Sequence, residues 1–304
     1  MVNYRKVAVL MGGVSSEREV SLRSGECIAR GLEEAGCDVS RVVLDAESVA
    51  GLIPGGTEAV FIALHGGYGE NGGVQRDLDA MGLKYTGPGA AASALAMDKW
   101  ATKRVFNARG ISTPRGTLAN VGDAPPRDLA FPLVVKPRSD GSSVGLTCPC
   151  GEGEWGAALE KAAALGEGVL VEEYIPGKEW TVGLIGGRPL PVIEIAPKGG
   201  VYDYGSKYTK GATTYTPLDE TPLTRECQAV AVRAFEAIGA RGLARVDFRV
   251  TPSGRCLALE VNTVPGFTET SLVPKAAAKA GMSFSETCLA ILSLAACDAG
   301  AKAP

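Results

Sequence analysis

The first third of the chain alternates short apolar runs with amphipathic helical patterns. Apolar runs cover 6–11, 39–44 and 58–64, and helical patterns cover 16–35 and 74–81. Strands that alternate with helices predict βαβ units, in which a parallel sheet carries helices on its faces. We therefore expect residues 1–95 to form an α/β lobe of their own.

The rest of the pattern predicts two further α/β lobes, over 96–180 and 181–304. Helical patterns and apolar runs of the second lobe lie at 99–108, 133–136, 154–164 and 169–173. Those of the third lobe lie at 180–185, 190–195, 223–238, 244–250 and 256–261. Near the end of the chain, Ser283 and Glu286 have the spacing of a capping box before an apolar run, which predicts a C-terminal helix.

Composition and charge exclude several classes of protein. The 304 residues are 45% hydrophobic and 21% charged, so the chain can bury several cores. A net charge of −3 with no basic cluster disfavours nucleic-acid binding. No apolar run reaches the ~18 residues of a membrane helix. Eight cysteines without CxxC spacing and a single histidine disfavour a thiolate metal site. We expect a soluble protein of the reducing cytoplasm that binds neither nucleic acid nor membrane.

Two segments, 67–72 and 87–92, match the glycine spacing of dinucleotide-binding loops. Neither lies in the first βα turn, where that fingerprint belongs, and the P-loop pattern GxxxxGK[ST] does not occur. A nicotinamide-dependent oxidoreductase is therefore disfavoured. These glycines are better interpreted as tight turns that line a cleft.

A lysine at the end of an apolar run begins a loop that suits an anion. Lys136 opens the sequence KPRSDGSSVG, which ends at Gly145. The lysine offers a positive charge, and the loop offers backbone N–H groups and hydroxyls. The segment is predicted to bind phosphate, with an ordinary solvated hairpin as the alternative.

Three oxygen-bearing side chains lie on two apolar runs near the end of the chain. Asp247 follows Arg245 by two positions, and Asn262 follows Glu260 by two, so each pair shares one face of its strand. Carboxylates and an amide facing one cleft form a site for Mg²⁺, which bridges nucleotide phosphates. A surface salt-bridge cluster is the alternative, but carboxylates within apolar strands are costly without partners.

At this point the sequence resembles the D-alanine–D-alanine ligases. The resemblance is carried by nine motifs in order between about residues 8 and 286, namely MGGVSSEREVS, ALHGGYGENG, YTGPG, MDK, VVKPRSDGSSVG, VYDYGSKY, RVDF, LEVNTVPGFTETSLVP and GMSF. It implies an ATP-grasp fold of three α/β lobes, the first of them Rossmann-like. It also implies that ATP activates one D-alanine as an acyl phosphate, which the amine of a second D-alanine then attacks.

The resemblance implies an ATP site with bound metal ions. Lys99 and Lys136 would bind phosphates, and Glu179 would bind the ribose. The full set of implied ATP-binding residues is Lys99, Lys136, Ser142, Ser143, Glu172, Glu173, Tyr174, Ile175, Glu179 and Lys207. Two Mg²⁺ or Mn²⁺ ions would be held by Asp247, Glu260 and Asn262.

The resemblance also implies substrate and catalytic residues. The substrate-binding residues would be Glu17, His65, Lys207, Tyr208, Ser271 and Leu272. The catalytic residues would be Glu17, Ser142, Tyr208, Arg245 and Gly266, the first three as a hydrogen-bonded triad and the last two as an oxyanion hole. From the residues alone, Glu17 is explained by its place at a helix N-terminus. The single histidine is more often structural than a ligand.

A polar and aromatic segment over 201–216 is predicted to be a mobile lid, with Gly205 and Gly211 as hinges. By resemblance, Tyr208 in this segment favours the dipeptide over D-alanyl-D-lactate. The chain departs from the usual family sequence at Gly205, Val264 and Phe267. It also carries Glu173 where many relatives have lysine.

Two other functions stay open from sequence. One is an ATP-grasp ligase with a different acceptor, because the second-substrate pocket is poorly determined. The other is a nucleotide sensor without catalysis, although the retention of Arg245, Glu260 and Asn262 argues against it. The partners expected are ATP and D-alanine, and a second copy of the chain bound through the N-terminal domain.

Overall fold

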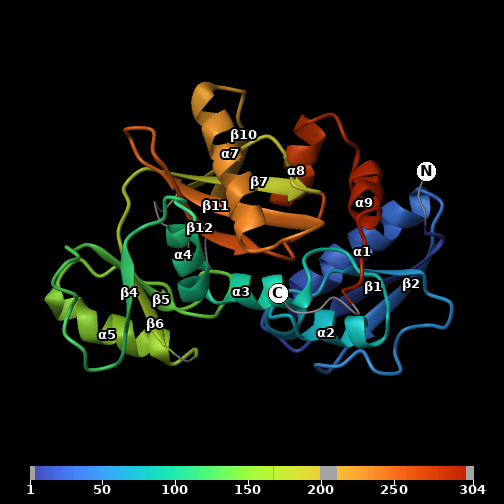
Figure 1. The fold of residues 1–304 in the computed structure, drawn as a ribbon, viewed down its shortest axis with the longest axis horizontal. Helices are drawn as coiled ribbons and strands as arrows, with labels where there is room; N and C mark the ends of the chain where they lie inside the picture. Colours follow the sequence, from blue (N-terminus) through green and yellow to red (C-terminus); the bar gives the residue numbers. More distant parts are fainter. Residues whose placement is uncertain (1–3, 167, 199–210, 299–304) are drawn as a thin grey trace.

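The computed structural model describes residues 4–166, 168–198 and 211–298 and arranges them in three lobes around three sheets (Figure 1). In Figure 1 the N-terminal sheet lies at the lower right, a small sheet lies at the lower left, and the largest sheet lies above and between them. The α/β architecture predicted from the sequence is confirmed.

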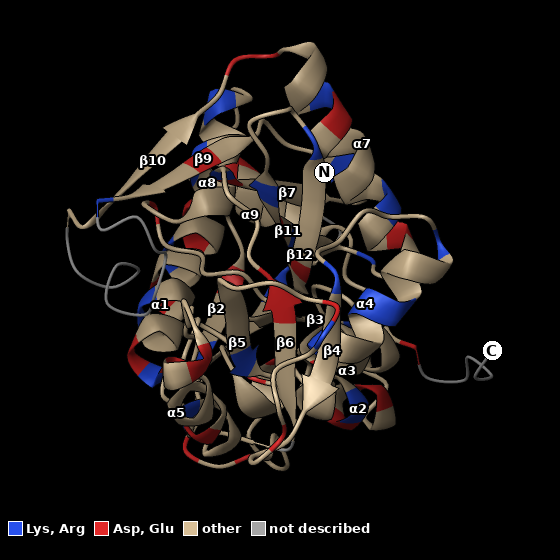
Figure 2. Cartoon of the chain, turned by 90° about the vertical axis from the view of Figure 1, so that its left-hand side faces the viewer, with Lys and Arg blue, Asp and Glu red and all other residues tan. Residues whose placement is uncertain are grey.

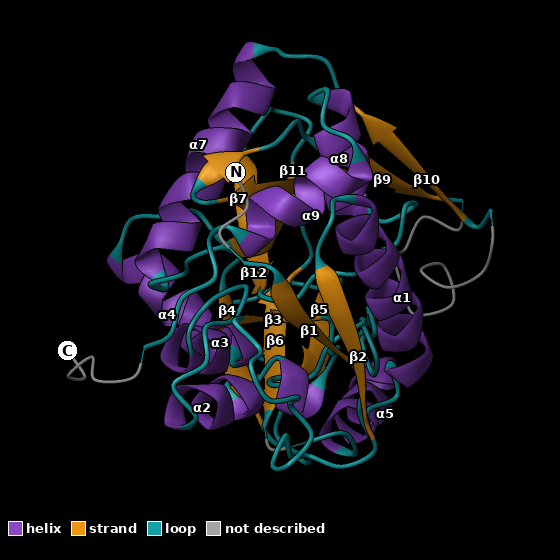
Figure 3. Ribbon diagram, turned by 90° about the vertical axis from the view of Figure 1, so that its right-hand side faces the viewer, coloured by secondary structure: helices purple, strands orange, loops and turns teal. Residues whose placement is uncertain are grey.

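The N-terminal sheet has three parallel strands. β1 (Lys6–Gly12) lies between β2 (Asp38–Leu44) and β3 (Ala59–Ile62). Six of the seven residues of β1 are buried, as expected for a central strand covered on both faces. Helix α1 (Arg18–Glu34) packs on this sheet, with the C-terminal helix α9 (Phe284–Leu292) beside it (Figure 3). The parallel sheet predicted for the first lobe is therefore present.

Short helices connect this sheet to the rest of the molecule. A 3-10 turn, η1 (Gly67–Gly69), and α2 (Gly73–Ala80) follow β3. The glycine pattern at 67–72 thus forms a turn and the start of a helix. Gly72 has φ +89° as the N-cap of α2, a conformation that favours glycine.

The small sheet has the order β4–β6–β5 and is antiparallel. It consists of β4 (Gly116–Ala119), β6 (Val169–Glu173) and β5 (Leu133–Pro137), and helix α5 (Glu152–Ala163) packs against it. Strand β4 was not predicted from the sequence. Only one of the four β4 residues is buried, so the strand has no apolar run to mark it.

The large sheet is antiparallel and carries all three predicted metal ligands, Asp247, Glu260 and Asn262. In sheet order its strands are β10 (Thr213–Pro217), β9 (Ile193–Pro197), β7 (Lys178–Ile185), β11 (Leu243–Val250) and β12 (Cys256–Asn262), with β8 (Arg188–Pro189) paired to β7. The strand predicted at 190–195 begins only at Ile193. Pro191 has no N–H for a ladder, and the buried side chains of Leu190 and Val192 belong to core packing.

The predicted lid segment over 201–216 lies largely outside the described residues, which resume at 211. Gly205, Lys207 and Tyr208 are among the residues not described. The end of the segment is strand β10, which pairs with β9 rather than forming a loop. Gly211, one predicted hinge, has φ +79°.

Helices cover the large sheet. They are α3 (Ala90–Met97), α4 (Lys99–Ala108), α7 (Pro222–Ala237) and α8 (Leu272–Lys279). Phe106 of α4 is fully buried in the core of this sheet, so α4 packs with the third lobe although its sequence position lies in the predicted second lobe. The divisions at 95/96 and 180/181 stay predictions.

The capping box predicted before the last helix is present. Ser283 Oγ accepts from the N–H of Glu286 at 3.2 Å, and Glu286 Oε2 accepts from the N–H of Ser283 at 2.8 Å. Within the described part of the chain, no helix is long and apolar enough to cross a bilayer. Figure 2 shows basic and acidic residues interspersed along α1 and α7.

Candidate active site

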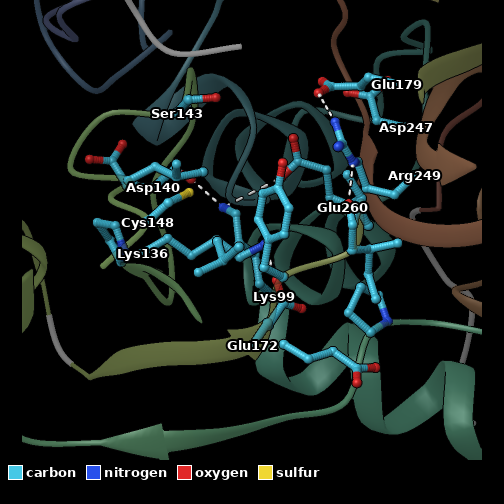
Figure 4. A pocket seen from close by; sticks show the side chains of 18 of the residues that line it. Lys99, Lys136, Asp140, Ser143, Cys148, Glu172, Glu179, Asp247, Arg249 and Glu260 are labelled. Atoms are coloured by element: carbon cyan, nitrogen blue, oxygen red, sulfur yellow. Dashed lines mark hydrogen bonds and ion pairs between the residues drawn. The ribbon is translucent and has the colours of Figure 1, made fainter. Parts of the chain in front are cut away.

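A first cavity lies between the small sheet and the large sheet (Figure 4). In Figure 4, Glu179, Asp247, Arg249 and Glu260 of the large sheet line one side of it. Eight of the ten residues predicted to bind ATP line this cavity, namely Lys99, Lys136, Ser143, Glu172, Glu173, Tyr174, Ile175 and Glu179. Of the other two, Ser142 lines a neighbouring cavity and Lys207 lies outside the described residues.

Three buried charges meet at the wall of this cavity. Glu172 is 2% exposed, and its two carboxylate oxygens lie 2.6 Å from Lys103 Nζ and 2.6 Å from Lys136 Nζ. Burial raises the pKa of Glu172, but the ammonium groups of Lys136 and Lys103 outweigh burial and hold that pKa below its ordinary value. Burial lowers the pKa of Lys136, but Glu172 and Glu260 together outweigh burial and raise that pKa. Both side chains are therefore ionised.

The N-terminus of α4 holds Lys99 beside the loop after β5, which is predicted to bind phosphate. Asp98 caps the helix by accepting from the N–H of Ala101 at 3.0 Å, and it also accepts from Arg138 Nε at 2.9 Å. Lys99 Nζ donates to the backbone carbonyl of Asp140 and lies 3.7 Å from Glu260. The cap therefore joins the loop after β5 to the helix that carries Lys99.

The loop itself holds two serines in an unusual backbone conformation. Ser142 and Ser143 have φ of +53° and +56°, in the left-handed region that costs a non-glycine residue about 1 kcal/mol or more. Ser143 lines the first cavity and Ser142 lines the second. Consecutive residues thus face two different cavities.

The predicted metal ligands lie together on β11 and β12. Asp247 and Glu260 are directly paired across the strands. Asp247 binds Arg245 through two contacts, at 2.9 and 2.8 Å, and accepts from Asn262 Nδ2 at 3.0 Å and from Thr181 Oγ1 at 2.5 Å. The buried Asp247 carboxylate is therefore fully paired, as buried charge requires.

The donor set fits a hard divalent cation. Two carboxylates and one amide on adjacent strands supply the oxygen donors that Mg²⁺ prefers. Within the described ranges, no group of three His, Cys, Asp or Glu side chains is placed to hold a metal ion. In the predicted set, the third protein ligand would be the amide of Asn262.

A second cavity adjoins the first, between the N-terminal lobe and the large sheet. It brings together seven of the residues predicted to bind substrate or to act in catalysis, namely Glu17, His65, Ser142, Arg245, Gly266, Ser271 and Leu272. These residues come from the N-cap of α1, the loops after β3 and β5, strand β11, the loop after β12 and the start of α8. Only the tertiary structure brings them together.

Glu17 joins the N-terminal lobe to the serine loop. It is the N-cap residue of α1, yet its side chain makes no capping bond there. Instead its carboxylate accepts a hydrogen bond of 2.5 Å from Ser142 Oγ, which lies 125 residues away. A helix-dipole role alone does not explain this contact.

The family described as D-ala D-ala ligase C-terminus matches residues 116–293, more than half of the chain. The chain belongs to the D-alanine–D-alanine ligase family. It is 50% identical to the D-alanine–D-alanine ligase of Syntrophotalea carbinolica over 94% of each chain. It is 44% identical to that of Aquifex aeolicus, over 92% of this chain and 97% of the relative.

Solved structures of D-alanine ligases have the same fold. The D-alanine–D-alanine ligase of Bacillus anthracis in complex with ATP is 31% identical, with a TM-score of 0.85 over 96% of this chain and 97% of that one. A D-Ala:D-Ser ligase of Enterococcus faecalis is 28% identical, with a TM-score of 0.83 over 96% and 99%. The ATP-grasp fold implied by the sequence resemblance is confirmed.

His65 of this ligase is buried and neutral. Its Nδ1 lies 3.0 Å from the carbonyl oxygen of Val264, which can only accept, so Nδ1 carries the proton. Its Nε2 then accepts from Ser24 Oγ at 3.1 Å, and Ser24 Oγ accepts from the N–H of Phe267 at 3.1 Å. Burial lowers the pKa of His65. The structural alternative for the single histidine therefore has direct support.

Sequence reasoning missed Glu70, which lines the site, and Ser24 and Lys103, which contact residues that line it. Glu70 lines the second cavity, and burial, followed by repulsion from Glu17, raises its pKa to about 8. The sequence feature that could have identified Glu70 is its position within the motif ALHGGYGENG. Lys103 follows Lys99 by four positions, which places both on one face of α4.

Proposed function

We propose that the chain joins two D-alanines into D-alanyl-D-alanine while ATP becomes ADP and phosphate, as a step in making the precursor of peptidoglycan. The relation between the two cavities carries this proposal. Asp247 and Glu260 line the first cavity, whereas Arg245 and Asn262, each two residues away on the same strands, line the second cavity. A nucleotide phosphate and a substrate carboxylate would therefore meet at β11 and β12.

The reaction needs two steps because oxide is a poor leaving group. The carboxylate of the first D-alanine attacks the γ-phosphorus of ATP, ADP leaves, and an acyl phosphate forms. The amine of the second D-alanine attacks the acyl carbon, loses a proton, and phosphate leaves. The protein contributes positioning, electrostatic stabilisation and exclusion of water from the acyl phosphate.

In the second cavity, Glu17 would bind the ammonium of the first D-alanine, with His65 at the same wall. Ser142, Glu17 and Tyr208 would form the triad that closes over the substrates. Ser271 and Leu272 would bind the carboxylate of the second D-alanine, because they begin helix α8 and helix N-termini suit anions.

The developing negative charge would be stabilised from two sides. Arg245 would neutralise the transferring phosphoryl group. Together with the backbone N–H of Gly266 it would form the oxyanion hole for the tetrahedral intermediate. Both residues line the second cavity, which supports this assignment.

In the first cavity, which we call the nucleotide cavity, Lys99, Lys136 and Ser143 would bind phosphates. Lys207 and Ser142 would also bind ATP. Glu172, Glu173, Tyr174 and Ile175 would contact adenine, and Glu179 the ribose. Asp247, Glu260 and Asn262 would hold two Mg²⁺ or Mn²⁺ ions. When bound, these ions neutralise phosphate charge.

We further propose that the enzyme works in the cytoplasm as a homodimer joined through its N-terminal lobe. Several large apolar side chains of that lobe are exposed, namely Val14, Val43, Leu52 and Met81. Exposed apolar side chains are common at subunit interfaces, which supports the proposed face.

The test is ATP-dependent phosphate release with Mg²⁺, using D-alanine, L-alanine, or D-alanine with D-lactate, and with the product identified by mass. The expected result is release with D-alanine alone and formation of the dipeptide. Release only with another acceptor would move the assignment to a different acceptor while keeping the mechanism. No release with any pair would contradict the proposed activity.

A further inference from the structure

Lys103 lies behind the nucleotide cavity, outside its lining, and is fully enclosed by protein. Its side chain is 3% exposed. Its Nζ lies 2.6 Å from a carboxylate oxygen of Glu172 and donates to Thr113 Oγ1 at 2.8 Å and to the carbonyl of Pro114 at 2.6 Å. Two hydrogen bonds and one ion pair therefore surround the ammonium group.

These contacts connect α4 to two parts of the cavity wall. Pro114 and Glu172 both line the cavity, on the segment before β4 and on β6. A single buried side chain therefore fixes their positions relative to Lys99, four residues earlier on the same helix. The contact to Glu172 also determines the charge on the wall.

The charge balance of this wall depends on Lys103. Burial lowers the pKa of Lys103, and the carboxylate of Glu172 opposes that shift. With Lys103 protonated, Lys103, Glu172 and Lys136 together carry a net charge of +1, and Lys136 lines the cavity. Without Lys103, Lys136 alone would compensate the negative charge of Glu172, and the buried pair of Glu172 and Lys136 would have no net charge. Because charges interact strongly in a buried site, this difference changes the potential that a phosphate meets.

We propose that Lys103 is a positioning residue for nucleotide binding, which holds the carboxylate of Glu172 and so leaves a net positive charge at Lys136 for the phosphates of ATP. This inference rests on one part of the proposed function, namely that the first cavity binds ATP. It makes Lys103 act through Glu172 and Lys136 and not by touching the nucleotide.

The experiment compares the dissociation constants of ATP and of adenosine, which has no phosphate, in the full chain with Mg²⁺. The variants are Lys103→Met, Lys103→Arg, Glu172→Gln and the double variant Lys103→Met/Glu172→Gln. The ratio of the two constants isolates the phosphate contribution from any general loss of structure. Melting temperatures report that loss separately.

Lys103→Met is expected to weaken ATP binding about tenfold relative to adenosine binding, whereas Lys103→Arg stays within about threefold of wild type. The double variant restores the net charge of +1, and its ratio is expected to return toward wild type. An unchanged ratio in Lys103→Met, or a double variant no better than Lys103→Met, would overturn the proposal.

If Lys103→Met does not fold, the comparison moves to the Glu172→Gln background. There, Lys103 has no carboxylate to hold, so adding Lys103→Met should leave the ratio of the ATP and adenosine constants within about threefold. A tenfold loss of ATP binding between these two variants would mean that Lys103 acts on the nucleotide without Glu172, and would also overturn the proposal. Because binding is measured without turnover, a chain that responds in this way but ligates no D-alanine would refute the proposed function and leave this inference standing.

Discussion

The imidazole of His65 donates a hydrogen bond of 3.0 Å to the backbone carbonyl of Val264, a residue 199 positions later in the chain. On its other side the ring accepts from Ser24, which in turn accepts from the N–H of Phe267. Val264 and Phe267 flank Gly266, the proposed oxyanion donor. The N-terminal lobe therefore holds this loop from both sides through two side chains.

Ser24→Ala tests this arrangement. The variant leaves the Phe267 N–H without its acceptor, and an unsatisfied buried polar group costs about 1–3 kcal/mol. We expect a lower unfolding free energy in urea and a lower kcat, with the KM for ATP unchanged, because only the oxyanion loop moves.

Ser21→Ala is the matched control. Ser21 is also fully buried on α1, where it accepts from the N–H of Gly12 and donates to the carbonyl of Ala63. The Ser21→Ala variant should lose a similar amount of unfolding free energy, while its kcat stays at the wild-type value. Equal kcat losses in both variants would mean that Ser24 acts only on folding.

Ser142→Ala should act on substrate binding. The change removes the hydroxyl that donates to Glu17, so the carboxylate is no longer held in the second cavity. We expect the KM for D-alanine to rise about tenfold, the effect of losing one charge-assisted hydrogen bond. Steady-state kinetics at saturating ATP would measure this.

Ser143→Ala controls for the strained backbone of the loop. Ser143 has nearly the same φ as Ser142, but its side chain lines the nucleotide cavity. Ser143→Ala should therefore raise the KM for ATP and not the KM for D-alanine. Indistinguishable kinetic effects would show that loop geometry, rather than the Glu17 contact, matters.

Arg245→Ala should abolish most turnover, with kcat reduced about 10³-fold or more if Arg245 stabilises the phosphoryl group. Circular dichroism should show a folded protein. Arg225→Ala, at an exposed ion pair with Glu220, should leave kcat unchanged. Near-normal turnover in Arg245→Ala would contradict the proposed role.

Glu70 should make folding stability depend on pH. Its pKa is raised to about 8 in the folded chain by burial and then by Glu17, against an ordinary value of 4.5. Between these two values the folded state holds a proton that the unfolded state has released. Stability should therefore fall as pH rises from about 4.5 to 8, by at most about 1.4 kcal/mol per pH unit.

Glu70→Gln should remove that slope, which urea unfolding at pH 5, 6.5 and 8 would measure. Glu58→Gln provides the control. Backbone N–H groups of Lys6 and Arg5 lower the pKa of Glu58, so its contribution is lost only as pH falls below about 4.5, and the slope between pH 5 and 8 should stay as in wild type. A slope that persists in Glu70→Gln would assign the pH dependence to another group.

The sequence by itself determined most of the longer helices and strands, but not α3, β4 or β8. Continuous burial along β1 and the two-residue spacing of Glu260 and Asn262 follow from local periodicity, which depends only on neighbouring residues. Motifs in register also determined the family. Where the apolar signal was weak, as in β4, or came from core packing without a strand, as at Leu190, the same reasoning was wrong.

Only the tertiary structure decided which of those residues meet. Glu17 contacts Ser142, His65 contacts Val264, and Lys103 pairs with Glu172, across separations that no local pattern encodes. Each contact depends on how separate lobes and helices pack, and packing is decided by the complementarity of whole surfaces. Burial is the physical reason these contacts matter, because it fixes the tautomer of His65 and makes the charges of Lys103 and Glu172 depend on each other.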